Sequence, residues 1–158
     1  MILGSFDGKL CLCDWDEGRR RASVDQRLQR ILNAKYVEGS SDIIEKAQQQ
    51  LNEYFLNQRR EFDIPLLFVG TDFQKKVWNE LLKIPYGSTV SYSELANRIG
   101  IPNAVRAVAN ANAVNALSII VPCHRIIGSN GTLTGYGGGL ERKRYLLNLE
   151  KKHYLCKK

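Results

Sequence analysis

Residues 91–112 read SYSELANRIGIPNAVRAVANAN, and this stretch predicts two short helices joined by a tight turn. A capping-box pattern at Ser91 and Glu94 starts the first helix, and Gly100 ends it. The second helix follows over residues 104–112. Such a pair is typical of a helix-turn-helix, which often binds DNA but also occurs in other helical domains.

The flanking residues extend this helical domain. Another capping box begins at Thr71, and its helix stops before Pro85. Residues 117–121 are rich in β-branched side chains and too short for a helix, so they predict a buried strand or extended segment. A glycine-rich loop over residues 126–139 and an amphipathic helix over residues 140–150 complete the predicted domain.

The beginning of the chain has a different pattern. Residues 1–15 predict a hairpin with its turn at Asp7 and Gly8. The stretch from residue 14 to 29 is charged, and we predict no element in it. Residues 42–57 carry apolar side chains at helical spacing, so this part of the chain predicts a small α/β lobe.

Residues 58–70 contain a proline and a glycine and show no helical period, so we place the connection between the two parts there. The expected fold is an α/β N-terminal lobe, a small sheet plus a helix, over residues 1–70. A mostly helical, winged-helix-like DNA-binding domain that carries the active site is expected to follow over residues 71–158.

The basic charge lies in the second half of the chain. Residues 1–71 carry 10 Lys or Arg and 11 Asp or Glu, a net charge of −1, whereas residues 72–158 carry 13 and 5, a net charge of +8. A one-sided excess of this kind is expected of a surface that neutralises phosphates. A basic face exposed only to solvent is the other interpretation of the charge.

The cysteines and histidines indicate neither a disulfide framework nor a metal site. The chain has two histidines, no Cys-x-x-Cys pattern and four cysteines, namely Cys11, Cys13, Cys123 and Cys156. A tetrahedral zinc site would need a different ligand spacing. We expect no metal and no cofactor.

The hydropathy pattern gives an expectation about the compartment. No apolar run approaches the ~18 residues that cross a bilayer, and the first residues lack the pattern of a secretory signal. We expect an intracellular protein, cytoplasmic or nuclear if the host is eukaryotic, with no membrane contact.

The dipeptide Cys123-His124 suggests nucleophilic chemistry, because a thiolate attacks well and a neighbouring base can accept the thiol proton. Adjacent side chains on an extended strand point to opposite faces, so the pair cooperates only if the backbone turns or a water molecule connects them. Pro122 favours such a turn. A structural cysteine beside an unrelated histidine is the other interpretation of the dipeptide alone.

The run IIVPCHRII at residues 119–127 resembles the active-site signature of the O6-alkylguanine-DNA alkyltransferases, also called methylated-DNA–protein-cysteine methyltransferases. The resemblance covers residues 71–150, about half of the chain. Further motifs stand in the order that this family has, and they are Ser91-Tyr92, Arg106, Asn115, Gly135-Tyr136-Gly137-Gly138-Gly139 and Leu146-Leu147-Asn148-Leu149-Glu150.

The resemblance implies repair of alkylated guanine in duplex DNA by a transfer that consumes the protein. Cys123 resembles the alkyl acceptor, and His124 resembles the base that deprotonates it through a water molecule. Glu150 would accept a hydrogen bond from the far imidazole nitrogen and fix the tautomer. The thioether product has no acyl group to hydrolyse, so turnover stops at one.

The resemblance also implies that the nucleotide leaves the base stack. Arg106 matches the wedge that fills the space of the flipped base, on a helix that enters the minor groove, and Tyr92 matches a proton donor to the leaving guanine. Ala104 and Arg125 are assigned to the DNA-binding surface by the same resemblance. We expect a monomer whose partner is double-stranded DNA.

The remaining matches concern the guanine pocket. Asn115 resembles a hinge between the helix pair and the active-site segment. The other residues assigned to substrate binding are Ile126, through its backbone carbonyl, Tyr136, Gly137 and Gly138 in the covering loop, and Lys143 near that loop.

Three other functions remain in view. An alkyltransferase-like binding protein lacks the acceptor, which Cys123 provides here. A Cys-His hydrolase would leave Arg106 and the basic second half unexplained. A helix-turn-helix regulator would leave Cys123, His124 and Glu150 without a role.

Overall fold

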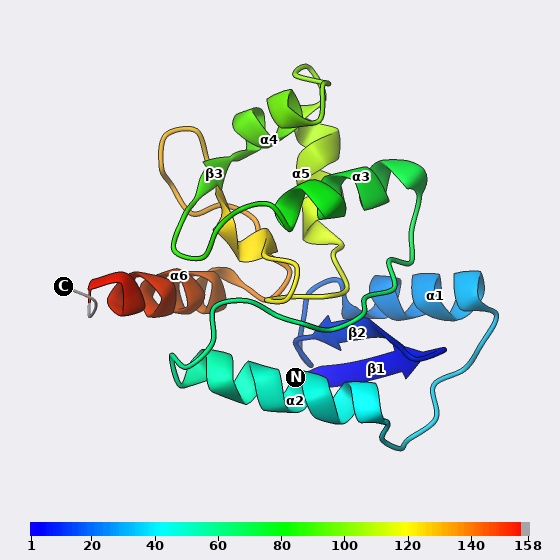
Figure 1. Ribbon diagram of the computed structural model, residues 1–158. Coiled ribbons are helices and arrows are strands. Elements are labelled where there is room, and N and C mark those ends of the chain that lie inside the picture. Colours follow the sequence, from blue (N-terminus) through cyan, green and yellow to red (C-terminus); the bar gives the residue numbers. More distant parts are fainter. Residues whose placement is uncertain (156–158) are drawn as a thin grey trace.

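The computed structural model describes residues 1–155, with side chains through residue 151 (Figure 1). The elements of the first part, in chain order, are β1 (Ile2–Phe6), β2 (Lys9–Asp14), α1 (Arg21–Leu32) and α2 (Asp42–Phe55). Those of the second part are α3 (Asp72–Leu81), β3 (Val90–Ser91), α4 (Tyr92–Arg98), α5 (Val105–Ala113), the 3-10 turn η1 (Cys123–Arg125), β4 (Ile126–Ile127) and α6 (Leu140–Leu155).

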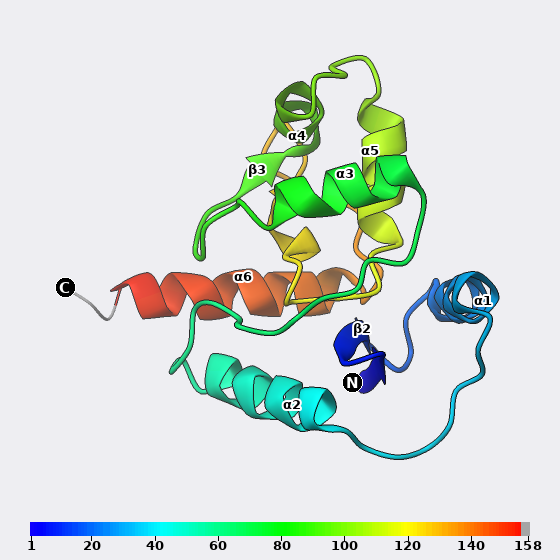
Figure 2. The same cartoon turned by 45° about the vertical axis from the view of Figure 1, so that its right-hand side comes forward.

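The hairpin of β1 and β2 is antiparallel, as the sequence predicts. Its turn residues Asp7 and Gly8 have φ angles of 51° and 75°, the left-handed pair that suits a two-residue hairpin turn. The hairpin lies between α1 and α2 (Figure 2). The predicted α/β lobe is therefore present.

Helix α1 occupies part of the charged stretch in which no element was predicted. Its buried side chains are Val24 and Leu28, one turn apart, and the rest of the helix is largely charged or polar. This narrow apolar stripe is a weak periodic signal. The left-handed residue Asn33 ends the helix.

The predicted helix pair is α4 and α5. The Ser91 hydroxyl accepts a hydrogen bond from the Glu94 backbone N–H at 3.1 Å, and Gly100, with a φ of 80°, follows the end of α4. Helix α3 begins with the complete capping box expected at Thr71. It is tied to α5 by the Trp78 indole, which donates to the carbonyl of Ala111 at 2.9 Å.

Backbone hydrogen bonds join the two parts of the chain. The connector runs beside β2, where the Leu10 N–H donates to Pro65 and the Leu67 N–H donates to Leu10, each at 2.9 Å. The end of β2 pairs with the active-site segment, since the Ser118 N–H donates to Cys13 at 2.7 Å.

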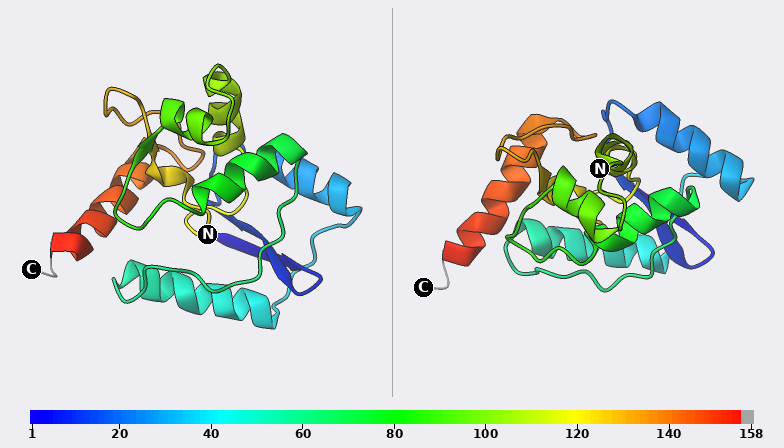
Figure 3. Two further views of the ribbon diagram at one scale, coloured as in Figure 1. Left: turned by 45° about the horizontal axis from the view of Figure 1, so that its top comes forward. Right: turned by 90° about the horizontal axis from the view of Figure 1, so that it is seen from above.

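One hydrophobic core contains residues of both parts, from Leu10 and Tyr54 to Cys123 and Leu146. Figure 3 shows α3, α4 and α5 grouped on the side of the molecule opposite α2. The boundary between residues 70 and 71 stays a prediction. Among the described residues, no helix has the length and apolar character needed to span a membrane.

Candidate active site

Two tight turns deliver Cys123 to the interior. The Ile120 N–H donates to Ser118 at 2.9 Å across Ile119, whose φ is 72°, an uncommon conformation for a β-branched residue. The Cys123 N–H donates to Val121 at 2.8 Å across Pro122, whose φ and ψ are −80° and 63°. The turn expected at Pro122 is thereby confirmed.

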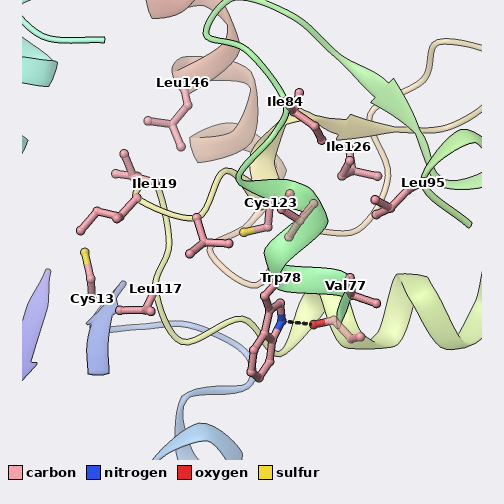
Figure 4. Packing of buried hydrophobic residues seen from close by; sticks show 14 of the residues in the cluster. Cys13, Val77, Trp78, Ile84, Leu95, Leu117, Ile119, Cys123, Ile126 and Leu146 are labelled. Carbon is pink, nitrogen blue, oxygen red and sulfur yellow. Dashed lines mark hydrogen bonds between the residues drawn. The ribbon is translucent and has the colours of Figure 1, made fainter. Parts of the chain in front are cut away.

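Cys123 lies in the hydrophobic core and is drawn among other buried residues of that cluster in Figure 4. Its side chain is 3% exposed. The 3-10 turn that begins here directs the imidazole of His124 toward α6. The nucleophile and its neighbouring base therefore both lie inside the protein.

The carboxylate of Glu150 is the centre of the polar site. His124 Nε2 lies 2.7 Å from Glu150 Oε1, the contact that the resemblance implied. Arg125 donates to both carboxylate oxygens, from Nη2 at 2.9 Å and from Nε at 3.1 Å. The Gly87 N–H at 3.2 Å and the Tyr54 hydroxyl at 2.8 Å complete the set.

The structure contradicts the assignment of Arg125 to the DNA-binding surface. Its side chain is buried, and besides Glu150 it donates to the carbonyl of Ile84 at 2.7 Å. A buried guanidinium that is bound to a carboxylate neutralises the negative charge of that carboxylate inside the protein. Arg125 therefore belongs to the interior of the site.

The pKa values of the pair favour a neutral imidazole beside an ionised carboxylate. Burial lowers the pKa of His124, and the hydrogen bond and charge of Glu150 oppose this shift. Burial acts to raise the pKa of Glu150, but His124 and Arg125 together hold it at about 2. Among the described residues, His124 Nδ1 is buried without a hydrogen-bond partner, so it is the imidazole nitrogen left to act as a base.

Burial raises the pKa of the Cys123 thiol to about 11, against the hydrogen bond of the Asn115 side chain and the charge of Lys143. At pH 7 only about one molecule in ten thousand then carries a thiolate. Cys123 therefore rests as a protonated thiol.

Asn115 connects the end of α5 to the active-site segment. Its side-chain amide donates to the carbonyl of Val121 at 3.0 Å, and its side-chain oxygen accepts from the Leu117 N–H at 3.0 Å. Both contacts hold the turn that precedes Cys123. Asn115 therefore links the two segments, and its role as a hinge stays a prediction.

Residues 133–139, called the lid below, cover the site. The Tyr92 hydroxyl donates to the carbonyl of Thr134 at 2.8 Å, and Lys143 Nζ donates to the same carbonyl at 2.8 Å. Lys143 is fully buried, and burial lowers its pKa to about 8. Tyr92 and Lys143 are thus brought together beneath the lid, and their roles toward the substrate stay predictions.

The first lobe holds the outer side of the lid. Trp15 Nε1 donates to the hydroxyl of Tyr136 at 2.9 Å, and the Arg19 N–H donates to the carbonyl of Gly137 at 3.2 Å. A Cβ at Gly138 would lie 2.3 Å from the Trp15 ring, so only glycine fits there. No sequence pattern predicted these contacts.

A small cavity of about 10 Å³ lies beside Cys123. It holds no more than about one water molecule, so the site is closed. Its walls come from both parts of the chain and are Asp14, Gly18, Arg20, Val24, Ala113, Asn115, Ser118, Tyr136 and Gly137.

The residues expected to contact DNA lie at the start of α5. Arg106 is exposed in its first turn, and Ala104 is the half-buried residue before the helix. Neither has a contact with Cys123 among the hydrogen bonds of the described residues. Their DNA contacts stay predictions.

Two buried residues of the site were not predicted. Tyr54 stood in the apolar pattern of its helix and had no local sign of a polar role. The Asn112 amide donates to the carbonyl of Cys123 at 3.4 Å, a carbonyl that also accepts from the Ile126 N–H. Residue types at these spacings alone could not reveal contacts that form only in the folded chain.

Comparison with known proteins finds the family that the active-site signature resembles. Residues 72–152 match the family described as "6-O-methylguanine DNA methyltransferase, DNA binding domain". A methylated-DNA–protein-cysteine methyltransferase of Methanosarcina acetivorans is 44% identical over 150 residues, which cover 94% of this chain and 96% of that protein. The Mycobacterium tuberculosis protein of the same name is 61% identical over 102 residues, which cover 65% of this chain and 62% of the relative.

A solved structure gives the same result for the fold. The crystal structure of Mycobacterium tuberculosis OGT in complex with DNA superimposes with a TM-score of 0.81 and 45% sequence identity, covering 96% of this chain and 86% of that one. The alignment spans both parts of the chain. The chain therefore belongs to the 6-O-methylguanine DNA methyltransferase family.

Proposed function

We propose that the protein repairs DNA as a methylated-DNA–protein-cysteine methyltransferase. It moves the alkyl group of O6-alkylguanine from duplex DNA onto Cys123 in a single irreversible turnover, with O4-alkylthymine as a second candidate substrate. The observation that carries this proposal is the buried Cys123 followed by His124, whose imidazole is bound to Glu150 at 2.7 Å. Membership of the family supports the substrate.

In the proposed reaction, His124 Nδ1 takes the thiol proton of Cys123 through a water molecule while Glu150 stabilises the imidazolium. The sulfur then forms a bond to the alkyl carbon as the bond between that carbon and the guanine oxygen breaks. The oxygen keeps the electron pair, and a proton from Tyr92 neutralises the leaving guanine. Sulfur holds the alkyl group as a thioether, which explains the single turnover.

The closed site requires a change before substrate enters. A guanine base cannot occupy a cavity of about 10 Å³, so the lid or the facing segment of the first lobe must move. The Tyr92 hydroxyl must also release the carbonyl of Thr134 in the lid before it can donate to the guanine base. Opening couples substrate entry to activation of a thiol that is otherwise protonated.

The nucleotide reaches the site by leaving the base stack, at a cost of a few kcal/mol. Arg106, exposed in the first turn of α5, fills the vacated space from the minor groove, with Ala104 beside the backbone. The pocket residues then assigned to the base are Asn115, Ile126, Tyr136, Gly137, Gly138 and Lys143. Double-stranded DNA is the partner, the protein acts as a monomer without a cofactor, and the reaction takes place in the cytoplasm, or in the nucleus of a eukaryotic host.

The proposal is tested by incubating the protein with a duplex that contains one O6-methylguanine and measuring its intact mass. The expected result is a gain of one methyl group, mapped by peptide analysis to Cys123 and absent in Cys123→Ala. An undamaged duplex is the control. Cleavage of a thioester or peptide substrate without methyl transfer would instead indicate a hydrolase.

A further inference from the structure

The carboxylate of Glu150 receives a hydrogen bond from a residue far away in the chain. Tyr54, in the last turn of α2, donates its hydroxyl to Glu150 Oε1 at 2.8 Å across 96 positions of sequence. The two side chains are both fully buried. The C-terminal end of α2 lies beside α6 in Figures 1 and 2, so the first lobe touches the catalytic pair directly.

The phenol ring of Tyr54 is held by packing on three aromatic neighbours. Its ring centroid lies 5.5 Å from that of Phe55, 5.7 Å from that of Phe62 and 6.1 Å from that of Tyr86. Such a ring has little freedom to rotate away from its acceptor. The hydroxyl is therefore aimed at Glu150 by the aromatic cluster.

Tyr54 and His124 share one acceptor atom. Glu150 Oε1 accepts from the Tyr54 hydroxyl and faces His124 Nε2 at 2.7 Å, while Arg125 Nη2 also donates to it. A donor that stabilises the negative charge of a carboxylate lowers its affinity for a proton. The Tyr54 hydroxyl therefore weakens the hold of Glu150 on a proton carried by the imidazole.

Several groups face this pair from the surrounding elements. Burial and the charge of Glu150 raise the pKa of Tyr54, so its hydroxyl stays protonated and able to donate at neutral pH. The other charged or titratable neighbours are Arg125 and Cys123 from the active-site segment, Tyr86 from the loop before β3 and Lys143 from α6. Arg125 and Lys143 act in the same direction as Tyr54 by disfavouring a charged imidazole.

We propose that Tyr54 is a positioning residue of the transfer reaction, whose hydroxyl orients the Glu150 carboxylate toward His124 and keeps the imidazole available as a base. The inference rests on the proposed function of Cys123 as alkyl acceptor. It gives the first lobe a part in the chemistry, in addition to its part in the core. Tyr54 acts through Glu150 and does not touch the substrate.

The test compares Tyr54→Phe, which removes only the hydroxyl, with Phe62→Leu, which alters the same aromatic cluster without a change in hydrogen bonding. Two rates are measured from pH 5.5 to 9. One is methyl transfer from an O6-methylguanine duplex, and the other is alkylation of Cys123 by iodoacetamide, followed at the peptide level. Thermal melting establishes that each variant is folded.

In Tyr54→Phe the acidic limb of both profiles is expected to move to higher pH by about half a unit to one unit, because His124 holds its proton more strongly. Transfer becomes about three- to tenfold slower on the acidic limb, below the pKa of His124, and stays within about twofold of wild type at pH 8.5. Phe62→Leu keeps the wild-type limb even if its melting temperature falls.

Coincident profiles for wild type and Tyr54→Phe would overturn the inference. A uniform slowing at every pH would do the same, because it would mean that the hydroxyl has only a structural role. If wild type transfers no methyl group, the proposed function fails, and the iodoacetamide profile still decides the role of Tyr54.

Discussion

Glu150 is the residue on which the polar contacts of the site converge. Its carboxylate accepts from His124, Arg125, Tyr54 and the Gly87 N–H in a fully buried setting. A buried charge is tolerated when its lone pairs are satisfied in this way. The free energy of unfolding therefore depends on Glu150 being ionised.

Glu150→Gln should lower the free energy of unfolding by about 3 kcal/mol or more at pH 7, because Arg125 loses its buried counter-charge. The pKa of Glu150 in the folded protein is about 2, below its ordinary 4.5. Its contribution is therefore complete above pH 4.5 and is lost as the pH falls toward 2. Urea unfolding should show the gap between variant and wild type closing over that window, and a gap that stays constant from pH 6 to 3 would contradict this.

Lys143→Met should slow methyl transfer by about five- to tenfold at pH 7, because the thiolate loses a nearby positive charge. The pKa of Lys143 is about 8, so the wild-type charge fades as the pH rises through 8, and the difference in rate should shrink above that value. Arg144→Met, at an exposed position on the same helix, is the control. A difference in rate that grows above pH 8 would disprove this role of the charge.

At the residue scale, the sequence predicted those contacts that a motif can carry. His124 and Glu150 were paired through the family resemblance, and the turn at Pro122 followed from residue chemistry. Arg125 was assigned wrongly, because a basic residue beside a nucleophile in a basic half looks like a DNA contact until its burial is known. Tyr54 could not be assigned, because its partner lies 96 positions away.

At the scale of elements, the lid is fixed from two sides. Tyr92 and Lys143 bind its carbonyls from below, and Trp15 binds Tyr136 from the first lobe. The guanidinium of Arg142 lies over the Trp15 ring, with its carbon 4.7 Å from the ring centroid. The segment before α1 is therefore the outer support of the lid.

Trp15→Phe should loosen the lid, because it keeps a ring beneath Arg142 and removes the hydrogen bond to Tyr136. A loss of about 1 kcal/mol of local stability corresponds to about fivefold faster amide exchange. Hydrogen exchange read by mass spectrometry should show this over residues 134–139 and leave α3 unchanged. Unaltered protection of the lid would show that Trp15 does not support it.

The elements with a strong periodic or capping signal were predicted, namely the hairpin, α2, α3 and the α4–α5 pair. Helix α1 was missed because only Val24 and Leu28 are buried on it. The segment before Cys123 was expected to be extended, and its tight turns depend on Ile119, a residue type that ordinarily avoids a positive φ. Such turns are imposed by tertiary packing.

At the scale of the whole molecule, the basic second half and the nearly neutral first half share one core. The net charge of +8 lies in residues 72–158, and the walls of the cavity beside Cys123 come from both halves. The proposed DNA contacts thus fall in one half, whereas the cavity beside Cys123 is built by both.

Arg106→Ala should slow repair in duplex DNA by about tenfold or more, because no side chain then fills the space that the flipped nucleotide leaves in the base stack. Transfer from a free O6-alkylguanine base should stay near the wild-type rate, since no flipping is needed. Arg30→Ala, at an exposed arginine on α1, is the control for charge. Equal losses on both substrates would contradict the wedge.

In the proposed reaction, Cys123 accepts one alkyl group and is then spent. The most direct test is a titration of the protein with increasing excess of an O6-methylguanine duplex, with the repaired base and the methylated Cys123 peptide both counted. Repaired guanine is expected to rise to one equivalent per protein and then stop, with one methyl group on Cys123. Repair that continues beyond one equivalent, or a methyl group found on another residue, would contradict it.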